Sequence, residues 1–101
     1  MVRGRSMEPT LQDGDRLLVR YGAPPHTGDL VLVRLPDGPH GPRPLSVKRL
    51  TRIEPDGSWW VESDHLGAGT DSWTVGALAP AALVGRVVLR LPRLPAAGPG
   101  R

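Results

Sequence analysis

The sequence contains no cysteine and no phenylalanine, and it has no long apolar run. Without cysteine the chain cannot build a disulfide framework, so nothing in it indicates an oxidising compartment. No stretch approaches the ~20 consecutive apolar residues of a membrane-spanning helix, and the opening Met1-Val2-Arg3-Gly4-Arg5 lacks the apolar segment of a secretory leader. We therefore expect no transmembrane segment, and a protein that acts in the cytoplasm or reaches a membrane by associating with it.

Clean helical periodicity is also missing, because glycine and proline punctuate the chain at short intervals. There are 13 glycines and 12 prolines in 101 residues, and the apolar runs between them are short and bounded by turn residues. This pattern is typical of β-strands. It predicts five strands, at residues 16–21, 30–35, 46–53, 58–63 and 83–91, and one helical turn at residues 79–83. Asp56-Gly57 is a hairpin signal between the third and fourth strands.

The length and composition predict one mostly β domain with a modest core. A chain of 101 residues with 39% hydrophobic residues fits a single compact domain, which we assign to residues 1–91. The stretch 36–44 has four prolines and two glycines and is predicted to be an exposed loop. Residues 92–101, rich in Pro, Gly and Ala, are predicted to be disordered. The net charge of +3 weakly favours an acidic partner surface and does not indicate nucleic acid.

One serine near the N-terminus stands in a constrained frame. Met7 supplies an apolar anchor next to Ser6, Pro9 fixes φ, and the turn Gly14-Asp15 leads into an apolar run. A serine hydroxyl needs a base to act as a nucleophile at neutral pH. Lys48 lies within an apolar run, where desolvation lowers the pKa of an ammonium group. These features predict a catalytic dyad of Ser6 and Lys48; the alternative is an ordinary strand lysine that points into solvent.

The same residues carry a family resemblance over about residues 4–90. The signal peptidase I family of serine endopeptidases has boxes similar to Ser6-Met7-x-Pro9-Thr10, Gly14-Asp15-x-Leu17-Leu18-Val19, Gly28-Asp29-Leu30-Val31 and Val47-Lys48-Arg49. Within that family the chain most resembles the maturation proteases of nickel-type superoxide dismutase. The resemblance implies a fold of curled antiparallel sheets, shared with the self-cleaving repressor peptidases. It also implies a precursor substrate, such as the propeptide of that dismutase, cut after Ala or Gly. We expect no cofactor and no metal.

Several neighbours of the serine are candidates for substrate contact. The backbone N–H of Ser6 is the natural donor to an oxyanion. Gly4 stands where many signal peptidases have a second serine donor, so it offers only close backbone approach; the alternative is a flexible tail. Met7 and Pro9 are predicted to line the cleft, with a core position as the alternative for Met7. Asp15 is predicted to be structural, accepting backbone N–H bonds in the turn that holds the serine segment.

The segment 63–73 resembles a later family box only in part. Asp64, Asp71 and Ser72 match it, whereas His65, Gly69 and Trp73 replace an asparagine, a lysine-orienting serine and an arginine that pairs with the aspartate. We therefore predict that Thr70 or Ser72 supplies the hydroxyl that orients the lysine. We also predict that Arg49 is the partner of Asp71.

Other interpretations have less support. Asp13, Asp15 and His26 lack the ligand spacing of a metal site, and the three histidines are too scattered to indicate a Ser-His-Asp triad. The sequence predicts a serine endopeptidase that binds an extended precursor segment along a sheet edge. Two rivals remain: a self-cleaving regulatory domain, and a β-module that has kept the scaffold without the activity.

Overall fold

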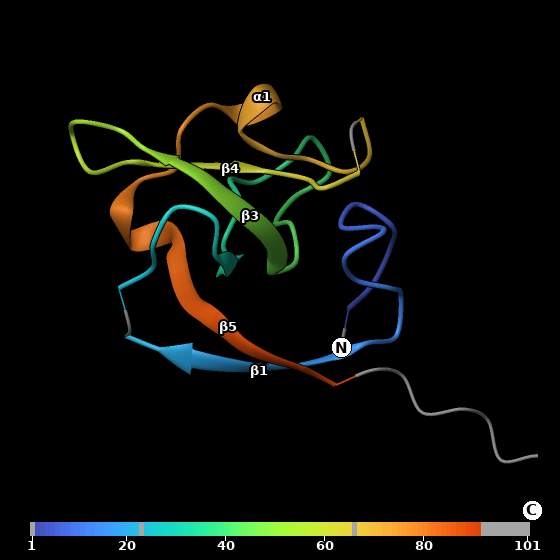
Figure 1. The fold of residues 1–101 in the computed structure, drawn as a ribbon. Helices are drawn as coiled ribbons and strands as arrows, with labels where there is room; N and C mark the ends of the chain where they lie inside the picture. Colours follow the sequence, from blue (N-terminus) through green and yellow to red (C-terminus); the bar gives the residue numbers. More distant parts are fainter. Residues whose placement is uncertain (1, 23, 66, 92–101) are drawn as a thin grey trace, which may run out of the picture.

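The computed structural model describes residues 2–22, 24–65 and 67–91. The chain forms five strands and two short helical elements: β1 (Arg16–Tyr21), β2 (Leu30–Val33), β3 (Ser46–Ile53), β4 (Trp59–Glu62), α1 (Ser72–Val75), a 3-10 turn η1 (Pro80–Ala82) and β5 (Leu83–Leu91). All strand pairs are antiparallel, in one sheet of order β1-β5-β2-β3-β4. The predicted mostly β fold is confirmed. Figure 1 shows the sheet curling from the β1–β5 pair at one end to the β3–β4 hairpin at the other.

The strand bounds follow the turn residues closely. The second strand ends at Val33, short of the predicted residue 35, because the proline-rich loop begins at Pro36. The predicted turn at residues 79–83 is a 3-10 helix with Pro80 at its start. Helix α1 was not predicted, since four residues are too few to show a helical period. The predicted disordered segment, 92–101, lies outside the described residues.

Two apolar clusters lie on opposite faces of the sheet. Neighbouring residues of a strand point to opposite faces, so Val31 and Leu30 belong to different clusters. The larger cluster consists of Val31, Val33, Leu35, Leu50, Val61 and Leu78. The smaller one consists of Val2, Met7 and Leu11, packed against Leu17, Leu30 and Val47. Each fully buried aliphatic side chain contributes about 1.5–3 kcal/mol, so the smaller cluster is enough to dock the N-terminal segment on the sheet.

Backbone and ionic contacts fix the same segment. The Val2 N–H donates to the Asp15 carbonyl at 2.6 Å, and the Gly14 N–H donates to the Val2 carbonyl at 2.7 Å. The buried Asp15 carboxylate accepts from the Gln12 N–H at 2.8 Å and from Arg90 Nε of β5 at 2.9 Å. Asp15 thus joins the serine segment to the far end of the sheet.

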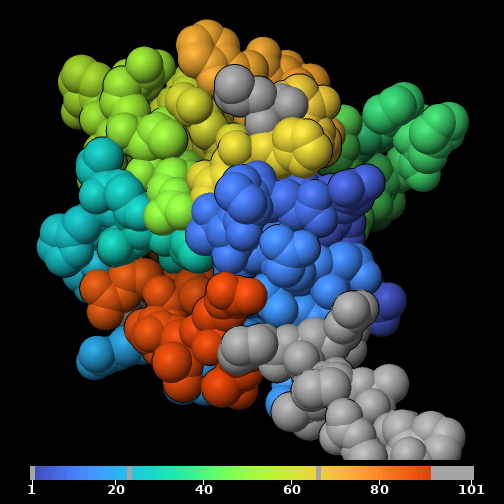
Figure 2. All heavy atoms as spheres, turned by 45° about the vertical axis from the view of Figure 1, so that its right-hand side comes forward, coloured from blue at the N-terminus to red at the C-terminus, as the bar shows by residue number. Residues whose placement is uncertain are grey.

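The surface view places two loops around the N-terminal segment. Figure 2 shows that segment in blue against the loop that follows β4, in yellow, while the proline-rich loop projects to one side in green. Within the part of the chain that the structure describes, no helix is long and apolar enough to cross a membrane.

Candidate active site

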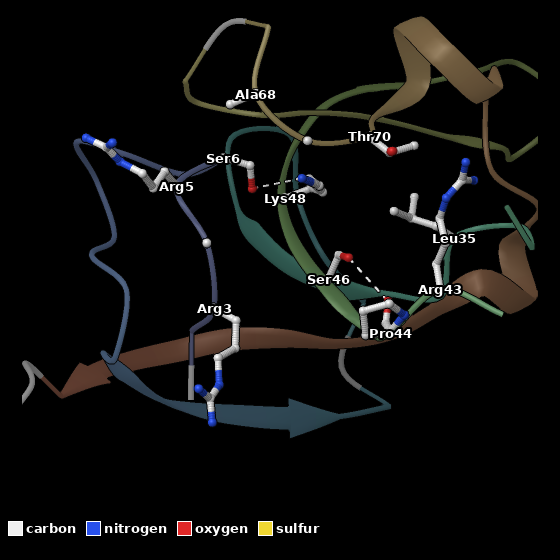
Figure 3. Close-up of a pocket in the computed structure, with 12 residues that line it drawn as sticks. Arg3, Arg5, Ser6, Leu35, Arg43, Pro44, Ser46, Lys48, Ala68 and Thr70 are labelled. Carbon is white, nitrogen blue, oxygen red and sulfur yellow. Dashed lines mark hydrogen bonds between the residues drawn. The ribbon is translucent and has the colours of Figure 1, made fainter. Parts of the chain in front are cut away.

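Ser6 and Lys48, forty-two positions apart, meet where the N-terminal segment lies against β3. Lys48 Nζ donates a hydrogen bond to Ser6 Oγ at 3.0 Å. Lys48 lies in the middle of β3, and only 3% of its surface is exposed. Figure 3 shows the two side chains pointing toward each other across the cavity. Lys48 is also the single lysine of the sequence, whose other basic side chains are arginines and histidines.

A second hydroxyl holds the amine of Lys48. Nζ also donates to Oγ of Ser63, a buried residue directly after β4, at 3.2 Å. Sequence reasoning missed Ser63, whose place follows from the strand register that the structure shows. Arg49 pairs with Glu62 and Leu50 with Val61, so the antiparallel register brings residue 63 opposite Lys48.

Neither residue predicted to orient the lysine does so. The buried hydroxyl of Ser72 accepts the Val61 N–H at 2.9 Å and ties α1 to β4. Thr70 lines the cavity beside the dyad, but its hydroxyl makes no hydrogen bond to another described residue. Both expectations are wrong because they followed the family's linear box, whereas Ser63 reaches Nζ through the pairing of two strands.

Burial sets the acid–base character of Lys48. Desolvation lowers the pKa of its ammonium group from the usual 10.5, and the negative charge of Asp71 opposes this shift without cancelling it. A lower pKa leaves more of the amine neutral near physiological pH. A neutral amine hydrogen-bonded to a serine hydroxyl can accept its proton, which is what a general base must do.

Gly69 packs closely against the side chains of Ser6 and Lys48. A Cβ at this position would lie 2.9 Å from Ser6 Cβ and 3.2 Å from Lys48 Nζ, and the residue has φ +72. A side chain here would collide with the dyad, and the backbone conformation itself favours glycine. Gly69 stands where the resemblance predicts a lysine-orienting serine, and the hydroxyl that contacts Lys48 Nζ comes from Ser63 instead.

The backbone around the serine is clamped by the segment that follows β4. The His65 N–H donates to the Ser6 carbonyl at 2.8 Å, and His65 Nδ1 lies 3.1 Å from the Arg5 carbonyl. On the other side, the Gly4 N–H donates to Asp13 Oδ1 at 2.8 Å, with Gly4 at φ 83. These contacts fix the peptide planes on both sides of Ser6.

An ion pair fastens the same segment to β3. Arg49 Nη2 lies 2.7 Å from Asp64 Oδ2, and the Thr10 hydroxyl donates to the same oxygen at 2.5 Å. Desolvation raises the pKa of Asp64, but the hydrogen bonds from Arg49 and Thr10 outweigh it and leave that pKa below its ordinary value. The predicted pairing of Arg49 with Asp71 is therefore wrong.

Asp71 instead accepts backbone hydrogen bonds. Its carboxylate accepts the Ser63 N–H at 3.0 Å and caps α1 by accepting the Trp73 N–H at 3.0 Å. It thus holds the backbone of Ser63, the residue that contacts Lys48, while its charge acts on the lysine from a distance.

Two cavities flank the serine. One, of about 380 Å³, is lined by both dyad residues together with Arg3, Gly4, Arg5, Leu35, Arg43, Pro44, Ser46, Ala68, Gly69 and Thr70. The other, of about 280 Å³, is more apolar and is lined by Ser6 and by Val2, Arg3, Gly4, Met7, Leu17, Val19, Leu32, Pro44, Leu45, Ser46 and Val47. Met7 is both a core residue and a cavity residue. Pro9 is exposed and lines neither cavity, so its contact with substrate stays a prediction.

The described residues contain no cluster of three or more His, Cys, Asp or Glu side chains suited to a metal ion.

The chain's similarity to known proteins bears on the chemistry of the dyad. The profile of the Peptidase S24-like family matches residues 1–88. The chain is 33% identical, over 118 residues, to mitochondrial inner membrane protease subunit 1 of Xenopus tropicalis, and the match covers 95% of this chain and 70% of that protein.

No solved structure matches the chain significantly. The predicted identity as a peptidase is confirmed at the level of the family, because the family match extends over nearly the whole described fold and includes both Ser6 and Lys48. The chain belongs to the Peptidase S24-like family and is a protease.

Proposed function

We propose that the protein is a serine endopeptidase that removes a leader or propeptide from a precursor protein, with Ser6 as nucleophile and Lys48 as general base. The observation that carries this proposal is the 3.0 Å hydrogen bond between Lys48 Nζ and Ser6 Oγ. It occurs where the lysine is buried and its pKa is lowered, and a lysine base requires both conditions.

The dyad supports an ordinary acyl-transfer sequence. Neutral Lys48 accepts the proton of the Ser6 hydroxyl as Oγ attacks the substrate carbonyl, and the resulting ammonium gives that proton to the leaving amine. The acyl-enzyme is then hydrolysed by a water molecule whose proton passes to Lys48, and the ammonium of Lys48 returns that proton to the departing Ser6 Oγ, which restores the free enzyme. Ser63 keeps Nζ aligned throughout, since its hydroxyl accepts a hydrogen bond from the amine in either protonation state.

The backbone N–H of Ser6 is the proposed oxyanion donor. It makes no hydrogen bond with any other described residue, whereas the Ser6 carbonyl is held by the His65 N–H at 2.8 Å. That contact fixes the carbonyl side of the residue, and the clamp at Gly4 fixes the chain before it. A donor oriented before the reaction stabilises developing negative charge without reorganisation.

The substrate is proposed to be an extended precursor segment lying across the two cavities beside Ser6. The smaller, more apolar cavity suits small apolar side chains next to the cut. The similar Xenopus protein is, by its name, a protease subunit of the mitochondrial inner membrane, which supports precursor processing at a membrane surface; a cytoplasmic site is the alternative. The propeptide of nickel-type superoxide dismutase is the specific substrate that the resemblance suggests.

Incubation with a purified precursor tests the proposal. Wild type, Ser6→Ala and Lys48→Ala are compared on the nickel-type superoxide dismutase precursor, with Ser58→Ala as a matched control in the turn before β4. We expect cleavage by wild type and the control, and none by the two dyad variants. Cleavage that persists in both dyad variants contradicts the dyad. Absence of cleavage by wild type, with this precursor and with other leader-bearing precursors, contradicts the endopeptidase function.

A further inference from the structure

The proline-rich loop at residues 36–44 brings an arginine to the catalytic cavity. Arg43 lines the same cavity as Ser6 and Lys48 and is only partly exposed. In Figure 3 it lies on one side of the dyad, while Arg3 and Arg5 lie on the other. The proposed chemistry at Ser6 does not require Arg43.

The loop holds the guanidinium of Arg43 in place. Nη1 donates to the Pro36 carbonyl at 2.9 Å, and Gly38 and Gly41 pair as an isolated bridge across the loop. A Cβ at Gly38 would lie 3.0 Å from Arg43 Nε and 3.2 Å from the guanidinium carbon. The glycine therefore makes room for the arginine, and the fixed side chain loses less entropy when it binds a ligand.

Arg43 is one of the six described arginines that have no carboxylate partner within 4.0 Å. Four arginines are paired within 4.0 Å of a carboxylate: Arg5 with Glu8, Arg49 with Asp64, Arg52 with Glu54, and Arg90 with Asp15. No described carboxylate lies within that distance of Arg43, and the cavity lining contains no acidic residue. An arginine that lines the cavity, is held by a backbone carbonyl and has no carboxylate within 4.0 Å can bind a carboxylate in a bidentate geometry.

We propose that Arg43 is a specificity residue that binds an acidic side chain, Asp or Glu, of the substrate segment lying beside Ser6. This inference rests on the proposed function, which supplies the extended substrate. It adds the chemical class of one substrate side chain. Arg3 and Arg5 reinforce the selection as exposed positive charges across the cavity, although Arg5 is partly neutralised by Glu8.

Peptide binding to the Ser6→Ala variant, which we expect to be inactive, tests the role of Arg43 independently of catalysis. The probe is a series of fluorescent ten-residue peptides, blocked at both ends so that no terminal carboxylate is present, each with Ala at two positions separated by one residue. A single Glu is moved through the remaining positions, and each peptide has a partner with Gln in its place. The affinity of each peptide for the Ser6→Ala variant is measured by fluorescence anisotropy. A separate set of peptides has a free C-terminal carboxylate in place of the C-terminal block.

We expect at least one Glu position to bind Ser6→Ala about five-fold more tightly than its Gln partner, the effect of a partly exposed ion pair. The preference should weaken with added salt. It should disappear in Ser6→Ala/Arg43→Gln, persist in part with Arg43→Lys, and remain in full in the control Ser6→Ala/Arg16→Gln. Arg16 is exposed at the start of β1 and lines neither cavity at the serine, so the control removes the same charge elsewhere.

A second variant guards against loss of folding. Gly38→Ala keeps every charge but displaces the guanidinium of Arg43, so it should also reduce the Glu preference. The inference is overturned if Glu and Gln peptides bind equally at every position, or if no Glu peptide binds at all. It is also overturned if the Glu preference remains intact in the Arg43→Gln and Gly38→Ala variants, or if only a free C-terminal carboxylate is preferred. A wild type that cleaves precursors without any Glu preference leaves the proposed function standing and removes only the role of Arg43.

Discussion

Ser63 lies opposite Lys48 across the β3–β4 pair, and its buried hydroxyl accepts a hydrogen bond from Lys48 Nζ at 3.2 Å. The amine therefore donates hydrogen bonds to two hydroxyls, those of Ser6 and Ser63. The second hydroxyl comes from the strand register, so the lysine is oriented even though the family's usual serine position is occupied by Gly69.

Replacing Ser63 tests this alignment. Ser63→Ala removes a hydrogen bond worth about 1–1.5 kcal/mol, so kcat should fall roughly ten-fold while KM changes little. Ser63→Thr keeps the hydroxyl and should restore most of the rate. Steady-state kinetics on one cleavable precursor provide the measurement. Equal kcat values for Ser63→Ala and wild type would show that Ser63 does not position the lysine.

The close approach of Gly69 to the dyad gives a second prediction. Gly69→Ala places a Cβ against Ser6 and Lys48, so it should separate their side chains and reduce kcat/KM by roughly a hundred-fold or more. Gly67→Ala is the matched control, because Gly67 has a similar φ of +79 but no atom within 4 Å of its Cβ position. Both variants should lose a similar stability, of about 1–2 kcal/mol, from backbone strain. Equal activities in the two variants would contradict the packing of Gly69 on the dyad.

The ion pair of Arg49 with Asp64 predicts a component of acid stability. The folded-state pKa of Asp64 is below its ordinary value of 3.8, so the unfolded chain binds the proton more readily and stability rises with pH across that window. The contribution is present above about pH 4 and is lost as pH falls through the folded-state pKa. Asp64→Asn should unfold more readily at neutral pH and lose less stability on acidification. Urea titrations between pH 2 and 7 measure this; parallel pH dependence in both proteins would contradict it.

The buried Lys48 also predicts a rise of stability with pH, but in the alkaline range. Its folded-state pKa lies below the usual 10.5, so between these two values the unfolded chain carries the extra proton and the free energy of unfolding rises with pH. Lys48→Met, which cannot titrate, should lack this rise and should be more stable than wild type below the folded-state pKa. Thermal unfolding from pH 6 to 10 tests this, and the same pH slope in both proteins would exclude a desolvated lysine.

Much of this site can be read from local sequence, and the misses that concern Lys48 and its neighbours share one cause. The five strands follow from short apolar runs between Gly and Pro, and the Ser6 and Lys48 boxes are distinctive enough to be matched along the chain. Ser63 and the Arg49–Asp64 pair are determined by contacts across strands. The expectations for Thr70, Ser72 and Asp71 came from a linear box, which carries no register. Aligning β3 with β4 on a two-residue turn at Asp56-Gly57 would have placed residue 65 opposite Lys48, because the register shift between Leu50 and Arg52 cannot be read from the sequence. Ser63, like the close approach of Gly69 to Ser6 and Lys48, therefore required coordinates.

The most direct test is the titration of Lys48 itself, which can be read without assignment because it is the only lysine of the sequence. The protein is labelled with carbon-13 at lysine Cε, and the chemical shift is followed by NMR against pH in the free protein. The same samples give the pH dependence of kcat/KM, which reports the base of the free enzyme. We predict a single midpoint below 10.5, shared by the resonance and the rise of kcat/KM, and still lowered in Ser6→Ala because burial is its main cause. A lysine that titrates at or above 10.5, with kcat/KM indifferent to its protonation, would contradict the serine–lysine mechanism.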